Sequence, residues 1–423
     1  MNERSGFHVR LIRGKKFVDE VFDNLIRPRV VVPFNFQQRM ALARVARISL
    51  ESSARHRLLH RCAKGRQSSM SRMHVAQMMA IAAAALCLSL PGNATEAKKL
   101  IAFAPELSLR EDLVFGGTEA GEAIGEIADI ALDSSENLYI LDSGFKKIHK
   151  FSASGERMLA FGAEGEGPGD LQGPIALAIG PDDVVYTAGM GAFVSAFDSS
   201  GKPLWSHRRA KDTVGAPAYS IAVDSAGFIY VCSPNFKTQK IISKYESKAF
   251  TLVAEFCDTY AVGADVDTRE ERSFAGGRIH VEGADKIWFS QLYPPAVKVL
   301  DLNGMLLRDC ATANWDTGKA GIFVKDGRTI LVPPSVFGDN AIPLTSSTYL
   351  VSTVHRPAEG PVDLSNVTVA LDVYEGNCRR VKSTQRNGLF LPRCVDSQRR
   401  LYVVEYRTLD GADVPVVVRY TLN

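Results

Sequence analysis

The sequence predicts an all-β protein, a six-bladed β-propeller made of four-stranded antiparallel blades. The first observation is the stretch from Gly125 to Gly162, which reads as four short β-strands joined by tight turns. The second is that degraded copies of this stretch recur up to the C-terminus. The third is that the last copy lacks its fourth strand, while a strand without a partner precedes the first copy. Repeated four-strand units of this size, which bury their faces only against their neighbours, are typical of propellers.

Each copy can be counted from the residue that closes its first strand. These anchors are Asp133, Gly180, Asp224, Glu282, Lys325 and Asp396. The second strands that follow them read LYIL, VVYTA, FIYVC, KIWFS, TILVP and LYVVEY. Six anchors predict six blades, and the long gaps between anchors place insertions at about 257–272 and 335–362. Both insertions are rich in turn formers or charge, so we expect surface loops there.

The two ends of the repeat region complement each other. The sixth copy stops after its third strand, VPVVVRYTLN, where the sequence ends. The segment LVFGGTEAGEAIGEI, which begins at Leu113, aligns with the outer strand and exit loop of the first copy at 159–171. We therefore expect an N-terminal strand to complete the C-terminal blade, which would remove an unpaired sheet edge from the ring.

The first 94 residues are unlike the rest. Residues 1–72 carry 16 Lys and Arg against five Asp and Glu and match no blade, so we expect a basic extension outside the fold, or translation starting at Met70 or Met73. Residues 73–94 combine a basic flank, an apolar run and small residues before Ala94, the pattern of a secretory signal. That run is too short and alanine-rich for a stable membrane span. Residues 95–423 are then the propeller, in the periplasm or outside the cell.

The charge of the remaining chain bears on its partners. Residues 73–423 carry 34 Lys and Arg against 42 Asp and Glu, so this part is mildly acidic. A nucleic-acid surface calls for a basic patch instead, so we expect no nucleic-acid partner.

Three motifs resemble the NHL-repeat and related secreted six-bladed propeller proteins. They are GEGPGDL at 165–171, ALDSSENLYILDSGFKKIHKFSASGE at 131–156 and IAVDSAGFIYV at 221–231. The resemblance covers about 112–423 and implies the fold. It implies little about activity, because that fold carries binding scaffolds, lyases, lactonases and sensor domains.

Strand alternation predicts which side chains line the axial channel. Four residues before the anchors stand Asp129, Ala176, Ser220, Arg278, Gly321 and Pro392, and two before them stand Ala131, Ala178, Ala222, His280, Phe323 and Cys394. Most are small, as crowding at an axis requires, so the polar ones mark a candidate binding site: Asp129, Ser220, Arg278 and His280. One interpretation is a polar site near the channel mouth in which Arg278 binds an anion or carboxylate. The other is an internal ion pair beside a hydrogen-bonded histidine.

No catalytic residue, metal or cofactor is predicted. Asp129 and Ser220 supply too few oxygen ligands for a hard cation, and the histidines are too scattered for a zinc site. Ser195 has no histidine partner that the sequence can place. Asp142 is expected to cap its own turn.

Two functions remain open. One is a secreted module that binds a protein, peptide or glycan without catalysis; the other is a lyase or hydrolase with its site at the channel mouth. Export permits disulfides among the five cysteines that follow Ala94. We expect at most two bridges, with Cys232–Cys257 the better candidate, and buried free thiols as the alternative.

Overall fold

The computed structural model describes residues 105–117, 123–165, 167, 169–190, 193–209, 217–258, 274–311, 321–325, 328–332, 335–357, 366–409 and 411–423. For 321–325 and 328–332 it describes the backbone alone. The chain divides into two units, Met1–Ser71 and Arg72–Asn423, and every described residue belongs to the second. The expected basic extension (1–72) and signal segment (73–94) lie outside the described residues. Within the described part of the chain, no helix has the length and apolar composition needed to cross a membrane.

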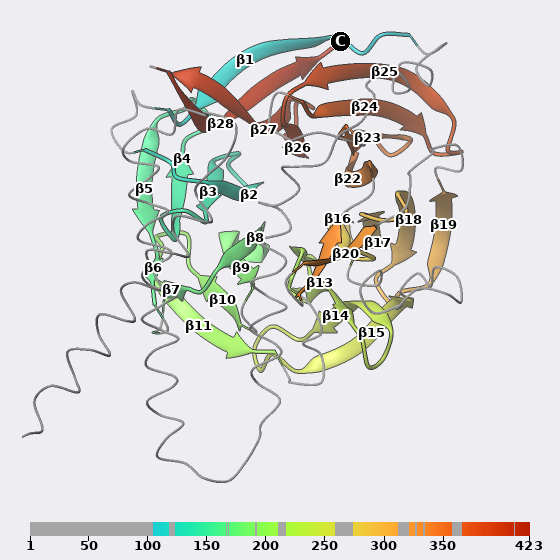
Figure 1. Ribbon diagram of the computed structural model, residues 1–423. Helices are drawn as coiled ribbons and strands as arrows, with labels where there is room; N and C mark the ends of the chain where they lie inside the picture. The colour runs from blue at the N-terminus through green and yellow to red at the C-terminus, as the bar shows by residue number, and fades with distance from the viewer. Residues whose placement is uncertain are drawn as a thin grey trace, which may run out of the picture. The chain divides into compact units, whose positions relative to one another are not determined.

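Six four-stranded antiparallel sheets follow one another around a ring (Figure 1), which confirms the predicted fold class. From the axis outward, blade 1 is β2 (Ile127–Leu132), β3 (Leu138–Asp142), β4 (Lys147–Phe151) and β5 (Arg157–Phe161). Blade 2 is β8 (Pro174–Ile179), β9 (Val185–Gly189), β10 (Phe193–Phe197) and β11 (Pro203–Arg208), and blade 3 is β12 (Ser220–Val223), β13 (Ile229–Asn235), β14 (Lys240–Tyr245) and β15 (Leu252–Asp258). Blade 4 is β16 (Gly277–Glu282), β17 (Lys286–Gln291), β18 (Ala296–Asp301) and β19 (Leu306–Ala311).

Blade 5 is β22 (Val336–Pro343), β23 (Thr348–His355), β24 (Thr368–Glu375) and β25 (Arg380–Asn387). Blade 6 is β26 (Phe390–Val395), β27 (Leu401–Leu409), β28 (Ala412–Leu422) and β1 (Leu109–Phe115). Two further pairs lie outside the blades, the short parallel pair β6 (Ala163–Glu164) and β7 (Asp170–Leu171) and the hairpin β20 (Gly321–Lys325) and β21 (Arg328–Val332).

The ring closes as the sequence predicts. β1 pairs antiparallel with β28, from Leu109 opposite Leu422 to Phe115 opposite Val417. The Phe115 side chain is buried, with its ring centroid 5.8 Å from that of Tyr402 in blade 6 and 6.2 Å from that of Phe151 in blade 1. The N-terminal strand therefore completes one blade and also packs against the next.

Every second strand places a buried aromatic residue between blades. The six residues are Tyr139, Tyr186, Tyr230, Trp288, Tyr349 and Tyr402. In several blades the polar tip of this residue reaches the acidic anchor of its own first strand: Tyr230 donates to Asp224 (2.8 Å) and Trp288 to Glu282 (2.7 Å). In blades 3 and 4 the anchor therefore satisfies the buried donor of the aromatic residue.

The prediction for the fifth blade is wrong. Its first two strands are β22 and β23, within the stretch that we expected to be a surface insertion, whereas β20 and β21 form a separate hairpin. The residue that closes β22 is Leu344 rather than an acid, so the acidic-anchor pattern fails here. The buried hydroxyl of Tyr349 has no hydrogen-bond partner among the described residues, and neither does that of Tyr139, whose blade has the acidic anchor Asp133.

The predicted disulfide is also wrong. Cys232 and Cys257 are free thiols, and the bond joins Cys310 to Cys378. Cys310 lies in β19, the outer strand of blade 4, and Cys378 in the turn before β25, the outer strand of blade 5. The bridge therefore connects the outer parts of two neighbouring blades, across the longest connection between successive blades.

Candidate functional site

The predicted channel residues lie near one end of the ring. Each first strand begins where its antiparallel second strand finishes, as the pairing of Ile127 with Asp142 shows in blade 1. Asp129 is the third residue of β2, Ser220 the first of β12 and Arg278 the second of β16. These side chains therefore lie toward the end that carries the turns between second and third strands.

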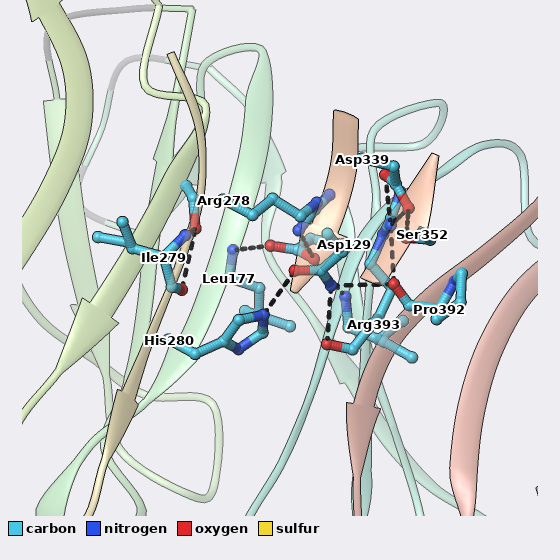
Figure 2. A network of polar contacts seen from close by, with 12 residues as sticks. Asp129, Leu177, Arg278, Ile279, His280, Asp339, Ser352, Pro392 and Arg393 are labelled. Atoms are coloured by element: carbon cyan, nitrogen blue, oxygen red, sulfur yellow. Dashed lines mark hydrogen bonds and ion pairs between the residues drawn. The ribbon is translucent and has the colours of Figure 1, made fainter. Parts of the chain in front are cut away.

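Asp129 and Arg278 meet across the channel (Figure 2). Arg278 Nη1 donates to Asp129 Oδ1 at 2.7 Å, and both side chains are largely buried. Burial acts to lower the pKa of Arg278, but the carboxylates of Asp129 and Asp339 outweigh it, so the pKa is raised. The ion pair is the structural alternative that the sequence left open.

Polar side chains in the first strands of blades 1, 3 and 5 bond to the backbone of the next blade. Such bonds satisfy buried polar groups and fix each blade relative to its neighbour. The bonds are Leu177 N–H to Asp129 Oδ2 (3.0 Å), Ile279 N–H to Ser220 Oγ (3.2 Å), and Asn340 Nδ2 to the carbonyls of Pro392 (3.0 Å) and Arg393 (3.3 Å). The Ser220 hydroxyl therefore bonds to the backbone of Ile279, the residue between Arg278 and His280, and not to the side chains of those two residues.

His280 pairs with Asn340 of blade 5, Nε2 to Oδ1 at 2.7 Å. Because Asn340 Oδ1 can only accept, Nε2 carries the proton and Nδ1 is the ring's unprotonated nitrogen. Burial lowers the pKa of His280, and the nearby Arg278 lowers it further. The imidazole is therefore neutral at pH 7, in an orientation set by the amide.

A second ion pair completes the network, from residues that the sequence reasoning missed. Arg393 Nη1 donates to both Asp339 oxygens (2.9 and 3.1 Å), and Ser352 Oγ donates to Asp339 Oδ2 (2.8 Å). Burial and the positive charge of Arg278 lower the pKa of Arg393. Figure 2 shows this pair beside Asp129 and Arg278, so the four charges belong to one centre.

Two features of the chain explain why its sequence did not identify Asp339, Asn340 and Arg393 as channel residues. Asp339 and Asn340 belong to the blade that was assigned to the wrong segment, so Gly321 and Phe323 were taken for the channel residues instead. Asp339 and Arg393 also lie at register shifts, between Gly338 and Asn340 in β22 and between Pro392 and Cys394 in β26. A bulge breaks the period of two, and strand alternation cannot then predict which way a side chain points.

Two further candidates, Asp142 and Ser195, lie outside the channel. The Asp142 carboxylate accepts from the backbone N–H groups of four residues at the turn: Gly125, Glu126, Gly144 and Phe145. It caps its own turn and the start of β2, as predicted. Ser195 Oγ lies 2.9 Å from Ser206 Oγ, so its partner is another hydroxyl rather than a histidine.

The surface at this end of the ring offers aromatic groups and a small cleft. Phe145 and Phe193 are about half and one third exposed, at equivalent turns between the second and third strands of blades 1 and 2. A cleft of about 30 Å³ lies between the 167–174 crossover and β9–β11, with Phe193 in its wall. That volume holds about one water molecule, far less than a small-molecule ligand needs. The described residues contain no group of three or more His, Cys, Asp or Glu that could hold a metal ion.

Comparison with known proteins supports the fold. No family model matches the sequence, and no curated protein matches it. A DUF4221 family member from Bacteroides vulgatus is 11% identical, with a TM-score of 0.50 over 76% of this chain and 99% of that one. Virginiamycin B lyase from Staphylococcus aureus is also 11% identical, with a TM-score of 0.45 over 75% of this chain and 100% of that one. At such identity the likeness concerns the fold alone, and this chain has the fold of the β-propeller proteins.

Proposed function

We propose that this protein is an exported propeller that binds a protein, peptide or glycan ligand without catalysis. The observation that carries the proposal is the engagement of the oxygens in the channel. The carboxylates of Asp129 and Asp339 already receive hydrogen bonds from Arg278, from Arg393 and from neighbouring groups. Three of about four lone-pair positions on each carboxylate are occupied in this way, which leaves little for a general base and too few oxygens for a metal site. These oxygens instead hold blades together, which supports a rigid binding scaffold.

The binding face in this proposal is the end of the ring that carries Phe145 and Phe193. Exposed aromatic side chains are typical anchors of binding surfaces. The channel residues open toward the same end, and we assign Asp129 and Arg278 to the floor of the site. Ser220 and His280 fix the strands from which that floor is built.

Export also belongs to the proposal. The signal pattern at 73–94 indicates passage through a secretory route, and the Cys310–Cys378 disulfide fits an oxidising compartment. In this proposal the mature protein lacks residues 1–94 and lies in the periplasm or outside the cell. The NHL-repeat resemblance agrees with a secreted ring.

A lyase or hydrolase is the second candidate, and one observation favours it. His280 is neutral, and Asn340 fixes the proton on Nε2, so Nδ1 presents a lone pair. An oriented neutral imidazole is suited to general-base catalysis. The lowered pKa makes it a weak base, which is why binding is preferred here.

Peptide and glycan arrays test the binding function. The wild-type protein should bind a defined subset, and the double variant F145S/F193S should bind at least tenfold more weakly. The matched control is M158S/L204S, since Met158 and Leu204 are as exposed but lie in the outer strands at the other end of the same blades. Arrays without selective binding by wild type would contradict the proposal. Turnover of a bound ligand that is lost in His280→Gln would favour the lyase or hydrolase.

A further inference from the structure

Two arginines lie in the channel with more donors than the channel has acceptors. Arg278 projects from β16 and Arg393 from β26, and each pairs with one carboxylate through Nη1 (Figure 2). A guanidinium has five N–H donors in a planar fork and stays protonated in proteins. Arg393 Nη1 also donates to the Pro392 carbonyl at 3.0 Å, but among the described residues only this one nitrogen of each guanidinium is bonded, so most of each fork remains.

The neighbouring acceptors are already in use. Asp129 Oδ1 accepts from Ile130 N–H and Arg278, and Oδ2 from Leu177 N–H. The Asp339 oxygens receive three bonds from Arg393 and Ser352. Three of about four lone-pair positions on each carboxylate are therefore occupied, and the one position left on each is too few for the remaining N–H groups of two guanidinium groups.

One donor shows this directly. Arg393 is 6% exposed, and its Nε is buried with no hydrogen-bond partner among the described residues. Leaving a buried donor unpaired is costly, and more so when it is charged. The repulsion from Arg278 adds to that cost, and it is one reason why the pKa of Arg393 is lowered.

We propose that Arg278 and Arg393 together bind a carboxylate group of the ligand at the mouth of the channel. A carboxylate matches the planar fork of a guanidinium and supplies acceptors without donors. The four charged side chains sum to zero, so a singly charged group perturbs the centre less than a doubly charged phosphate. The inference rests on the proposed binding function and names the group recognised, the terminus of a peptide or an acidic sugar.

Titration calorimetry of the full-length protein with paired probes tests this assignment. The probes are Ala-Ala with its C-terminal amide, galacturonate with galactose, and inorganic phosphate. We expect at least one carboxylate to bind and to raise the melting temperature, and its neutral counterpart to bind at least tenfold more weakly. Arg278→Gln and Arg393→Gln should each reduce carboxylate affinity at least tenfold.

Two double variants remove one positive and one negative charge together, so that no buried charge is left unpaired and a loss of binding is not due to misfolding. R278Q/D129N and R393Q/D339N remove each arginine together with its carboxylate and should still lose the probe. Arg407→Gln, in the second strand of blade 6 and paired with Glu111 and Glu405 rather than with a channel carboxylate, should keep full affinity. Equal binding of the neutral probes, tighter binding of phosphate, no binding of either carboxylate, or full affinity in both balanced variants would each overturn the carboxylate assignment. The binding function would survive these results if the arrays still report selective ligands.

Discussion

Asp142 illustrates how one buried carboxylate organises a turn of this fold. Its side chain is fully buried and accepts from four backbone N–H groups, with His149 Nε2 at 3.4 Å. Burial acts to raise the pKa of Asp142, but the bonds from His149 and the backbone prevail, so the pKa is lowered from 3.8. Folding therefore stabilises the ionised carboxylate of Asp142 relative to its protonated form.

Replacing Asp142 with Asn should lower the free energy of unfolding by about 1–3 kcal/mol at pH 7, because the amide cannot accept all of these bonds. The carboxylate stabilises the fold above its unfolded-state pKa, and this contribution is lost as pH falls through the folded-state pKa. Wild type and Asp142→Asn should therefore converge below about pH 4. Urea unfolding at several pH values measures this. Asp198→Asn, at an exposed turn with a similar pattern of bonds, should change stability less; equal losses would contradict the role of burial.

The buried tyrosines offer a second comparison. Tyr230 donates to Asp224, whereas the hydroxyl of Tyr349 has no partner in the part of the chain that the structure describes. Tyr349→Phe should therefore leave stability unchanged or raise it by up to about 1 kcal/mol, while Tyr230→Phe should lower it by about 1–3 kcal/mol. Thermal melting of the two variants provides the measurement. Equal losses would indicate that Tyr349 has an acceptor after all.

Among the elements, β1 and the hairpin β20–β21 differ in what they pair with. β1 covers the edge of β28, whereas β20 pairs with β21 alone among the described strands. Deleting 105–117 should expose a sheet edge and cause aggregation or a large fall in melting temperature. Replacing 321–332 with a short Gly-Ser linker should change the melting temperature little. Similar losses from both would show that the hairpin supports the ring.

The insertion that we expected at about 335–362 contains β22 and β23, so its deletion should also be destructive. The repeat pattern predicted the blades, the closure and the channel register, because these follow from alternation and from turn chemistry. It failed in blade 5 because it placed the anchor at Lys325, at the end of β20, instead of at Leu344, although the aromatic position of Tyr349 was a usable signal. Arg393 could not be placed, since a bulge reverses the alternation at that point.

For the whole molecule, the disulfide is the covalent link between blades 4 and 5 outside the main chain. It closes a loop across a sequence separation of 68 residues, so its reduction should lower the free energy of unfolding by about 2–4 kcal/mol. Melting with and without reductant tests this, and C310A/C378A should match the reduced protein. Burial raises the pKa of Cys257 to about 11 and also raises that of Cys232, so these thiols should alkylate slowly until the protein unfolds. An unchanged melting temperature under reduction would show that the disulfide does not stabilise the fold.

The pairing of β1 with β28 has a consequence for biosynthesis. About 300 residues separate Phe115 from its partner Val417, so β1 must wait for β28. At about 5–20 residues per second the wait is roughly 15–60 s on the ribosome. The ring cannot close until β28 has been made, so the edge of β1 that β28 covers stays unpaired for that time.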